Sequence, residues 1–335
     1  MNQNEMKRSN FPKELKGLRW ELFRACEELR QASDRAARKE LERKVNKLRI
    51  DLGWELLDRG HYEYGLALYS SLPSRTYGSE KWNGMSRALT GMGLYREAMD
   101  LLEKGLKSYP ESYALWVGMG ALHAELGNDF DALESFETAI RLAPEDDHTA
   151  LFNKVQVLAK LGCYGDAVSD LKELIEREPW DPRYWIVLGS CHLDMGCPED
   201  ALKDYRMAMK LWQEDPTPYE GGCLYMGIYA TYRTLGMLRE ALDIAKEGLK
   251  RLPEEDPGLY QNLADAYNAL GWPSDAVRVL KKGIEIFPDD EELKEVLKDI
   301  EDNMNEPGDD RKPPILGLLV LLALLRKRFG RGEMR

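Results

Sequence analysis

Seven glycines recur along this chain of 335 residues at intervals of 33, 34, 35, 34, 40 and 35 residues. The fifth residue after each glycine is small, an alanine in six cases and Gly65 in the first. A period of this length is typical of proteins that stack one supersecondary unit many times. The chain is therefore expected to fold as a repeat array. The seven glycines are Gly60, Gly93, Gly127, Gly162, Gly196, Gly236 and Gly271.

The segment WIVLGSCHLDMGCPEDALKDY, residues 185–205, shows how one repeat is built. Its apolar residues return at helical spacing, which predicts a first helix with one buried face. Gly196 ends that helix, because glycine adopts the left-handed C-terminal conformation at the least cost. Pro198 opens a second helix, where a missing N–H costs nothing. Gly189 and Ala201 are the small residues expected where the two helices cross, so each repeat is predicted as a helix–turn–helix pair.

These residues resemble the tetratricopeptide-repeat pattern, W-x2-L-G-x2-Y followed by G, A, F/Y, A and P. The repeat at 182–215 carries Trp185, Leu188, Gly189, Gly196, Ala201, Tyr205 and Ala208 at those positions. The resemblance implies an all-α, right-handed solenoid of helix–turn–helix units with helical caps, in which the first helices line the concave surface. Seven units are expected, the first of them shortened: 46–78, 79–112, 113–146, 148–181, 182–215, 222–255 and 257–290.

Charged helices are expected to cap both ends of the array, because terminal repeats expose a face that a neighbour would otherwise cover. Residues 1–45 form the predicted N-terminal cap, with helices from Pro12 to about Arg30 and from Ser33 to about Leu48. A coiled-coil contact to a partner is the alternative interpretation of this region. Residues 289–304 form the predicted C-terminal capping helix, with acidic residues at its start.

The C-terminal tail differs in composition from the repeats. Residues 305–314 are a predicted linker, and 315–335 a predicted apolar helix with a basic tail, in which ILGLLVLLALL (315–325) precedes RKRFGR. Eleven apolar residues reach about 16 Å as a helix, short of the roughly 20 residues that a spanning helix needs. Three interpretations stay open: Ile315–Arg328 lies on a membrane surface, docks onto protein, or spans as a short anchor.

Composition excludes several classes of function. The formal net charge of -12 argues against nucleic-acid binding, which needs an excess of Lys and Arg. The five cysteines show no CxxC spacing, which argues against a disulfide framework or a zinc site and favours a reducing cytoplasm. The N-terminal segment has no apolar core of signal-peptide length, so no export by that route is expected.

No catalytic motif stands out, so no catalytic residue, metal ligand or cofactor is predicted. The sequence contains no phosphate-binding loop, GxSxG or HExxH. His123 and His192 recur at one position of the repeat, but that position is normally buried between helices, which favours a structural role. The chain is expected not to be an enzyme.

The expected function is that of a protein-interaction scaffold or adaptor that binds a peptide or helix in the concave groove. An alternative is a membrane-associated assembly factor that the apolar-basic tail recruits to a bilayer, which would place the chain at the inner face of a membrane. The family's carboxylate clamp for chaperone tails is not expected, because its Lys, Asn and Arg set is missing. Self-association through the tail is a further interpretation. The candidate groove residues are Val117, Ala121, Phe152, Gln156, Arg183, Ile186, Ser190, Met226 and Ala230.

Overall fold

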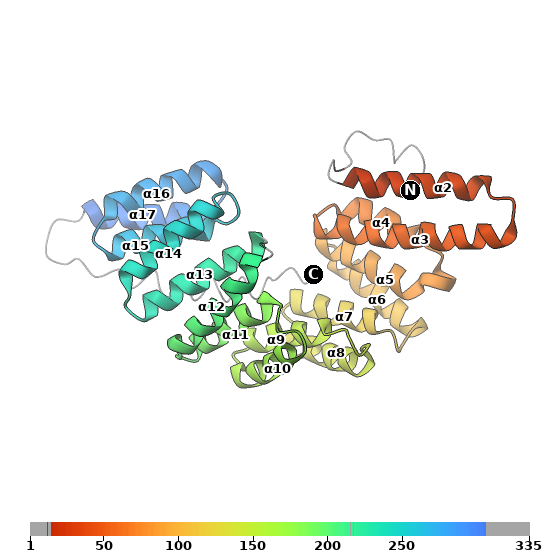
Figure 1. Ribbon diagram of the computed structural model, residues 1–335, viewed down its shortest axis with the longest axis horizontal. Helices are drawn as coiled ribbons and strands as arrows, with labels where there is room; N and C mark the ends of the chain where they lie inside the picture. The colour runs from red at the N-terminus through yellow and green to blue at the C-terminus, as the bar shows by residue number, and fades with distance from the viewer. Residues whose placement is uncertain (1–11, 13–14, 215, 217, 306–335) are drawn as a thin grey trace. The chain divides into compact units, whose positions relative to one another are not determined.

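The computed structural model describes residues 12, 15–214, 216 and 218–305, and every regular element in these ranges is a helix. The prediction of an all-helical fold is confirmed (Figure 1). The helices of the described residues are α2 (Lys16–Gln31), α3 (Arg35–Asp58), α4 (Tyr62–Ser70), α5 (Ser74–Gly91), α6 (Tyr95–Ser108), α7 (Tyr113–Glu125), α8 (Asp129–Leu142), α9 (Thr149–Lys160), α10 (Tyr164–Arg177), α11 (Pro182–Asp194), α12 (Pro198–Glu214), α13 (Pro218–Thr234), α14 (Leu238–Arg251), α15 (Pro257–Ala269), α16 (Pro273–Ile286) and α17 (Glu291–Asn305).

The periodic glycines form the turns between the two helices of each repeat, as predicted. All seven have φ between 72° and 80°, a left-handed conformation that only glycine adopts without strain. At Gly196 the backbone closes the turn, since the N–H of Cys197 donates to the carbonyl of His192 at 2.8 Å. Pro198 and Pro273 begin the second helices α12 and α16, also as predicted.

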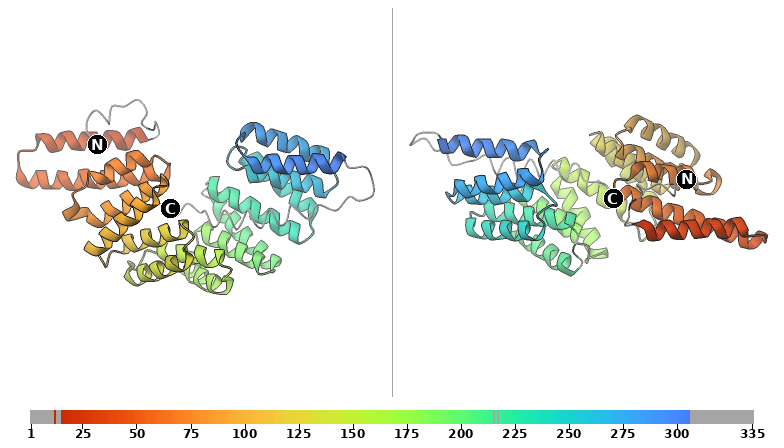
Figure 2. Two further views of the ribbon diagram at one scale, coloured as in Figure 1. Left: turned by 180° about the vertical axis from the view of Figure 1, so that it is seen from behind. Right: turned by 90° about the horizontal axis from the view of Figure 1, so that it is seen from above.

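The helices group into two compact units, one within residues 1–157 and the other within 158–332. The first unit holds α2 to α8 and most of α9, and the second holds α10 to α17. From α2 to α8 and from α10 to α17, consecutive helices pack against one another, and first helices of neighbouring repeats, such as α5 and α7 or α11 and α13, also touch. Figure 2 shows the same helices from two further sides.

The N-terminal part of the first unit departs from the expected boundaries between helices. The second charged helix is predicted to end near Leu48, but α3 continues without a break to Asp58. It has no glycine turn or proline near Leu48, so nothing in the backbone stops it. α5 begins at Ser74, before the expected start of its repeat, and contains a kink at Tyr77. Leu22 of α2 and Leu52 of α3 belong to one buried cluster.

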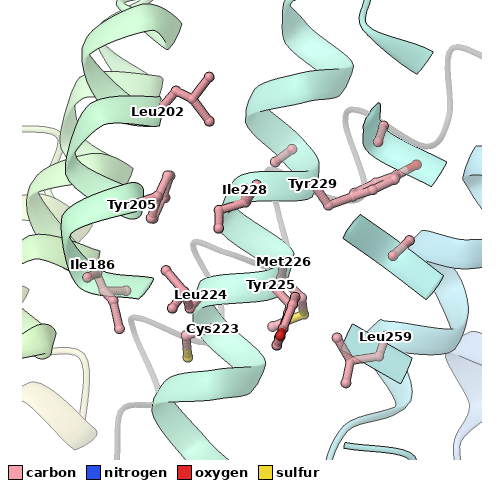
Figure 3. Packing of buried hydrophobic residues seen from close by; sticks show 14 of the residues in the cluster. Ile186, Leu202, Tyr205, Cys223, Leu224, Tyr225, Met226, Ile228, Tyr229 and Leu259 are labelled. Atoms are coloured by element: carbon pink, nitrogen blue, oxygen red, sulfur yellow. The ribbon is translucent and has the colours of Figure 1, made fainter. Parts of the chain in front are cut away.

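The core of the second unit joins side chains from several successive helices (Figure 3). Tyr205 of α12 lies at its centre and is fully buried. A Cβ atom on Gly189 of α11 would lie 3.0 Å from the Tyr205 ring, and one on Gly227 of α13 would lie 2.5 Å from it. The ring therefore fits between two first helices only because both present glycine at the contact.

The last described helix, α17, repeats the features of a first helix. The Asp290 carboxylate accepts a hydrogen bond from the Leu293 N–H at its start, as Asp256 does from the Gly258 N–H at the start of α15. Asn305, the first residue of the predicted linker, ends α17, and residues 306–335, including the predicted apolar tail at Ile315–Arg328, lie outside the described residues. Within the described ranges, no helix combines the length and apolar character that a membrane crossing requires.

Candidate functional site

The candidate residues of the first unit lie on two first helices. Val117 and Ala121 are one turn apart on α7, and Phe152 and Gln156 are one turn apart on α9, so each pair shares one helix face. Val117, Ala121 and Gln156 are half-buried, whereas Phe152 is buried. This face offers apolar and neutral polar side chains to a ligand, and no charge comes from these four residues.

A hydrogen-bonded contact fixes the start of α9 beside the start of α7. The Tyr113 hydroxyl donates to the Asp147 carboxylate at 2.7 Å and accepts from the Ala150 N–H at 3.2 Å. Asp147 also accepts from the Thr149 N–H at 2.9 Å. Burial raises the pKa of Tyr113, and the bond to Asp147 adds to that effect. Burial alone would raise the pKa of Asp147, but the bonds from Thr149 and Tyr113 bring this pKa below its ordinary value.

Four of the five candidate residues in the second unit are buried. Ile186 and Ser190 on α11 and Met226 and Ala230 on α13 lie where these first helices pack together, and Figure 3 shows Ile186 and Met226 within the apolar core. Their burial follows from direct contact between the two helices. Only Arg183 is exposed, and its guanidinium binds the Asp181 carboxylate, with Nε 3.0 Å from both oxygens.

A polar network between α13 and α15 was not among the predicted residues. The Arg233 guanidinium donates to Asp265 at 2.8 Å, and the Tyr229 hydroxyl donates to the same carboxylate. Burial raises the pKa of Tyr229, and Asp265 raises it further. Tyr229 and Arg233 are one helical turn apart, a spacing visible in the sequence, but their shared partner lies more than thirty residues away. Periodicity alone could not supply that pairing.

His192 and Cys191 of α11 pack within their repeat. His192 Nδ1 lies 2.5 Å from the Asp204 carboxylate, and burial raises the pKa of Asp204. Cys191 is buried, and burial raises its pKa to about 12, so its thiol is protonated near neutral pH. Among the described residues, no three His, Cys, Asp or Glu side chains gather as a metal-binding group.

Two family models match parts of the chain. Residues 257–300 match the model of a tetratricopeptide repeat, and residues 103–216 match that of a bacterial transcriptional activator domain. A stretch of 159 residues is 29% identical to the human superkiller complex protein 3, covering 47% of this chain and 10% of that protein. The chain thus spans about a tenth of the length of this relative.

Solved structures share the fold at low sequence identity. A tetratricopeptide repeat protein from Parabacteroides merdae aligns with a TM-score of 0.58 at 17% identity, over 76% of this chain and 98% of that one. The Cut9–Hcn1 hetero-tetramer of the APC/C aligns with a TM-score of 0.62 at 18% identity, over 90% and 57%. The paired helices, glycine turns and family match define a helical-repeat protein. Within that class, residues 257–300 match the tetratricopeptide-repeat family, and the fold is shared with solved tetratricopeptide-repeat structures.

Proposed function

We propose that this chain is a non-enzymatic interaction scaffold or adaptor, and that the first-helix face of its first unit binds a peptide or helix. The observation that supports this is the accessibility of Val117, Ala121 and Gln156, which lie on two helices that the Tyr113 hydroxyl holds together. A face built on rigid helices with small apolar side chains suits an extended or helical apolar ligand.

The nine candidate residues divide into two roles in this proposal. Four residues are accessible to a ligand: Val117, Ala121, Gln156 and Arg183. The other five are buried in the packing of the helices: Phe152, Ile186, Ser190, Met226 and Ala230. Charged substitutions at the buried positions would disturb folding, so they cannot test binding. The accessible positions can.

A display library of random peptides, selected on the full-length protein, tests this function. We expect enriched apolar sequences whose binding falls by at least about tenfold in Val117→Glu and Ala121→Glu, because a charge would have to be buried against the ligand. Met207→Glu, an exposed substitution on α12, is the control and should leave binding unchanged. Enriched peptides that bind both α7 variants as tightly as the wild type would place the binding face elsewhere, and a failed enrichment would remove the support for a peptide-binding scaffold.

A further inference from the structure

A row of exposed apolar side chains follows the turns between first and second helices in the second unit. Met195, Met237 and Trp272 each adjoin one of the turn glycines and are 48%, 37% and 48% exposed. The turn geometry does not need them, because the glycine and the backbone hydrogen bonds close each turn. Exposed apolar side chains that recur along one edge of a protein offer contacts to an apolar segment. We call these three residues the turn-edge surface.

The direction of the helices brings the end of the described chain to this edge. α16 reverses the direction of α15 through the turn at Gly271, and α17 reverses it again, so α17 runs parallel to α15. The two helices are in contact, and their third residues, Leu259 and Leu293, are both buried. α13, α15 and α17 lie side by side in Figure 1. α17 therefore ends at Asn305 on the side of the second unit where Trp272 lies.

The sequence that follows has a length and a pattern that suit this surface. Nine residues such as 306–314 can reach up to about 30 Å when extended, and eleven residues such as 315–325 would span about 16 Å as a helix. Packed helices lie 8–10 Å apart, so the three turns extend over roughly 20 Å. The tether and the run are thus long enough to follow the turn-edge surface.

Charge supports the same match. The second helices that leave these turns carry Glu199, Asp200, Glu240 and Asp275 in their first turns. Asp200 pairs with Lys203 and Asp275 with Arg278 on the same helices, so within the described residues Glu199 and Glu240 are the two of these carboxylates that form no ion pair. Arg326, Lys327 and Arg328 directly follow the apolar run. An apolar row beside acidic helix starts is complementary to an apolar segment with a basic end.

We propose that residues 315–325 of the same chain dock on the turn-edge surface of the second unit, with the basic residues 326–328 facing the acidic helix starts. The occupant is thus a segment of the protein itself, and the surface differs from the first-helix face proposed for partners. Docking removes apolar area from water on both the tail and the turns. It also makes the tail unavailable to other ligands while it is bound.

Photo-crosslinking in the full-length protein tests this contact. A benzoylphenylalanine residue in place of Leu321 should cross-link, at the mass of the monomer, to peptides that contain Met195, Met237 or Trp272. Met237→Glu combined with Trp272→Glu should lower this yield at least about fivefold, because two apolar contacts are lost. Met207→Glu, which changes an equally exposed methionine on α12 away from the turns, should leave the yield unchanged.

Three results would overturn the proposal. Cross-links found only at the mass of a dimer would assign the surface to a second copy of the chain. If the wild-type cross-links contained none of the peptides with Met195, Met237 or Trp272, the tail would not bind this surface. Another partner would then cover the surface, or the tail would bind a membrane. An unchanged yield in the doubly substituted protein would show that these side chains do not bind the tail. All substituted turn residues are exposed, and circular dichroism checks that each variant is folded.

Discussion

The ring of Tyr205 contacts the first helices of two repeats, and this contact depends on glycine at both. In Gly227→Ala, the new methyl group would stand 2.5 Å from the ring, which is fully buried and has little room to move. We expect the free energy of unfolding to fall by about 1–3 kcal/mol through overpacking. Urea denaturation followed by circular dichroism measures the change.

Gly165→Ala is the matched control for that substitution. Gly165 lies in α10 of the same unit and is exposed, and a Cβ atom added there would meet nothing within 4 Å. Alanine there should leave stability unchanged or raise it by up to about 1 kcal/mol, because it favours the helix. Equal effects at Gly165 and Gly227 would show that the Tyr205 contact does not govern the requirement for glycine.

Gly196 tests a different property of glycine, its backbone conformation. A Cβ atom there would meet nothing within 4 Å, so Gly196→Ala creates no clash. The φ of 76° nevertheless disfavours any side chain, and we expect a loss of about 1 to 2 kcal/mol in the free energy of unfolding. Gly196→Asn should lose less, since asparagine tolerates this conformation better. Thermal and urea unfolding of both variants would show the order, and a more stable alanine variant would contradict it.

Cysteine reactivity gives a residue-level test of burial in the second unit. Cys191 is buried with a raised pKa of about 12, whereas Cys163 is exposed. We expect iodoacetamide at pH 8 to alkylate Cys191 more than about tenfold more slowly than Cys163, because the thiolate is the reactive form. Mass spectrometry of the digested protein measures both rates. Denatured protein is the control, in which the difference should largely disappear.

At the scale of elements, one hydroxyl group links the start of α7 to the start of α9 by hydrogen bonds. Tyr113→Phe removes the bonds to Asp147 and Ala150 but keeps the ring. A loss of about 1–2 kcal/mol in the free energy of unfolding is expected at pH 7. The lowered pKa of Asp147 adds a pH dependence: its contribution is present above the ordinary value of 3.8 and is lost as pH falls below it.

The variant should therefore lose less stability than the wild type between about pH 5 and about pH 3, the range that brackets the titration of an ordinary aspartate at about 3.9. Urea titrations at both pH values measure the difference. Tyr95→Phe, at an exposed tyrosine of α6, is the control and should follow the wild type. Parallel pH profiles for wild type and Tyr113→Phe would show that Asp147 does not depend on this bond.

The sequence predicted the turns well because each is carried by one residue with a local requirement. Gly196 needs a positive φ and Pro198 lacks an N–H, and both constraints act within a few residues. The extent of α3 was harder to predict, since its shortened repeat has no comparable stop near Leu48. The burial of Ile186 and Met226 could not be predicted from periodicity either. Residue spacing identifies the helix face on which a side chain lies, but the packing of α11 against α13 decides whether that side chain is accessible to solvent.

At the scale of the whole molecule, the repeats make stability a sum of local contributions. In a repeat array, each unit contacts mainly its neighbours, so a defect should spread only over adjacent repeats. The consecutive helix contacts within each compact unit fit this description. The seven glycine turns are alike, and close contacts between aromatic rings and glycines recur: Tyr205 lies against Gly189 and Gly227, as Tyr69 lies against Gly53 and Gly84.

Amide hydrogen exchange in Gly227→Ala tests how far such a defect extends. We expect faster exchange in peptides from α11 to α14, which surround the Tyr205 ring, because local opening there becomes easier. Peptides from α2 to α5 should keep their wild-type rates, since no contact of Tyr205 reaches them. Gly165→Ala provides the reference for a substitution without a clash. If exchange instead rose evenly over all described helices, the chain would unfold as one cooperative body, and the nearest-neighbour description of these repeats would be wrong.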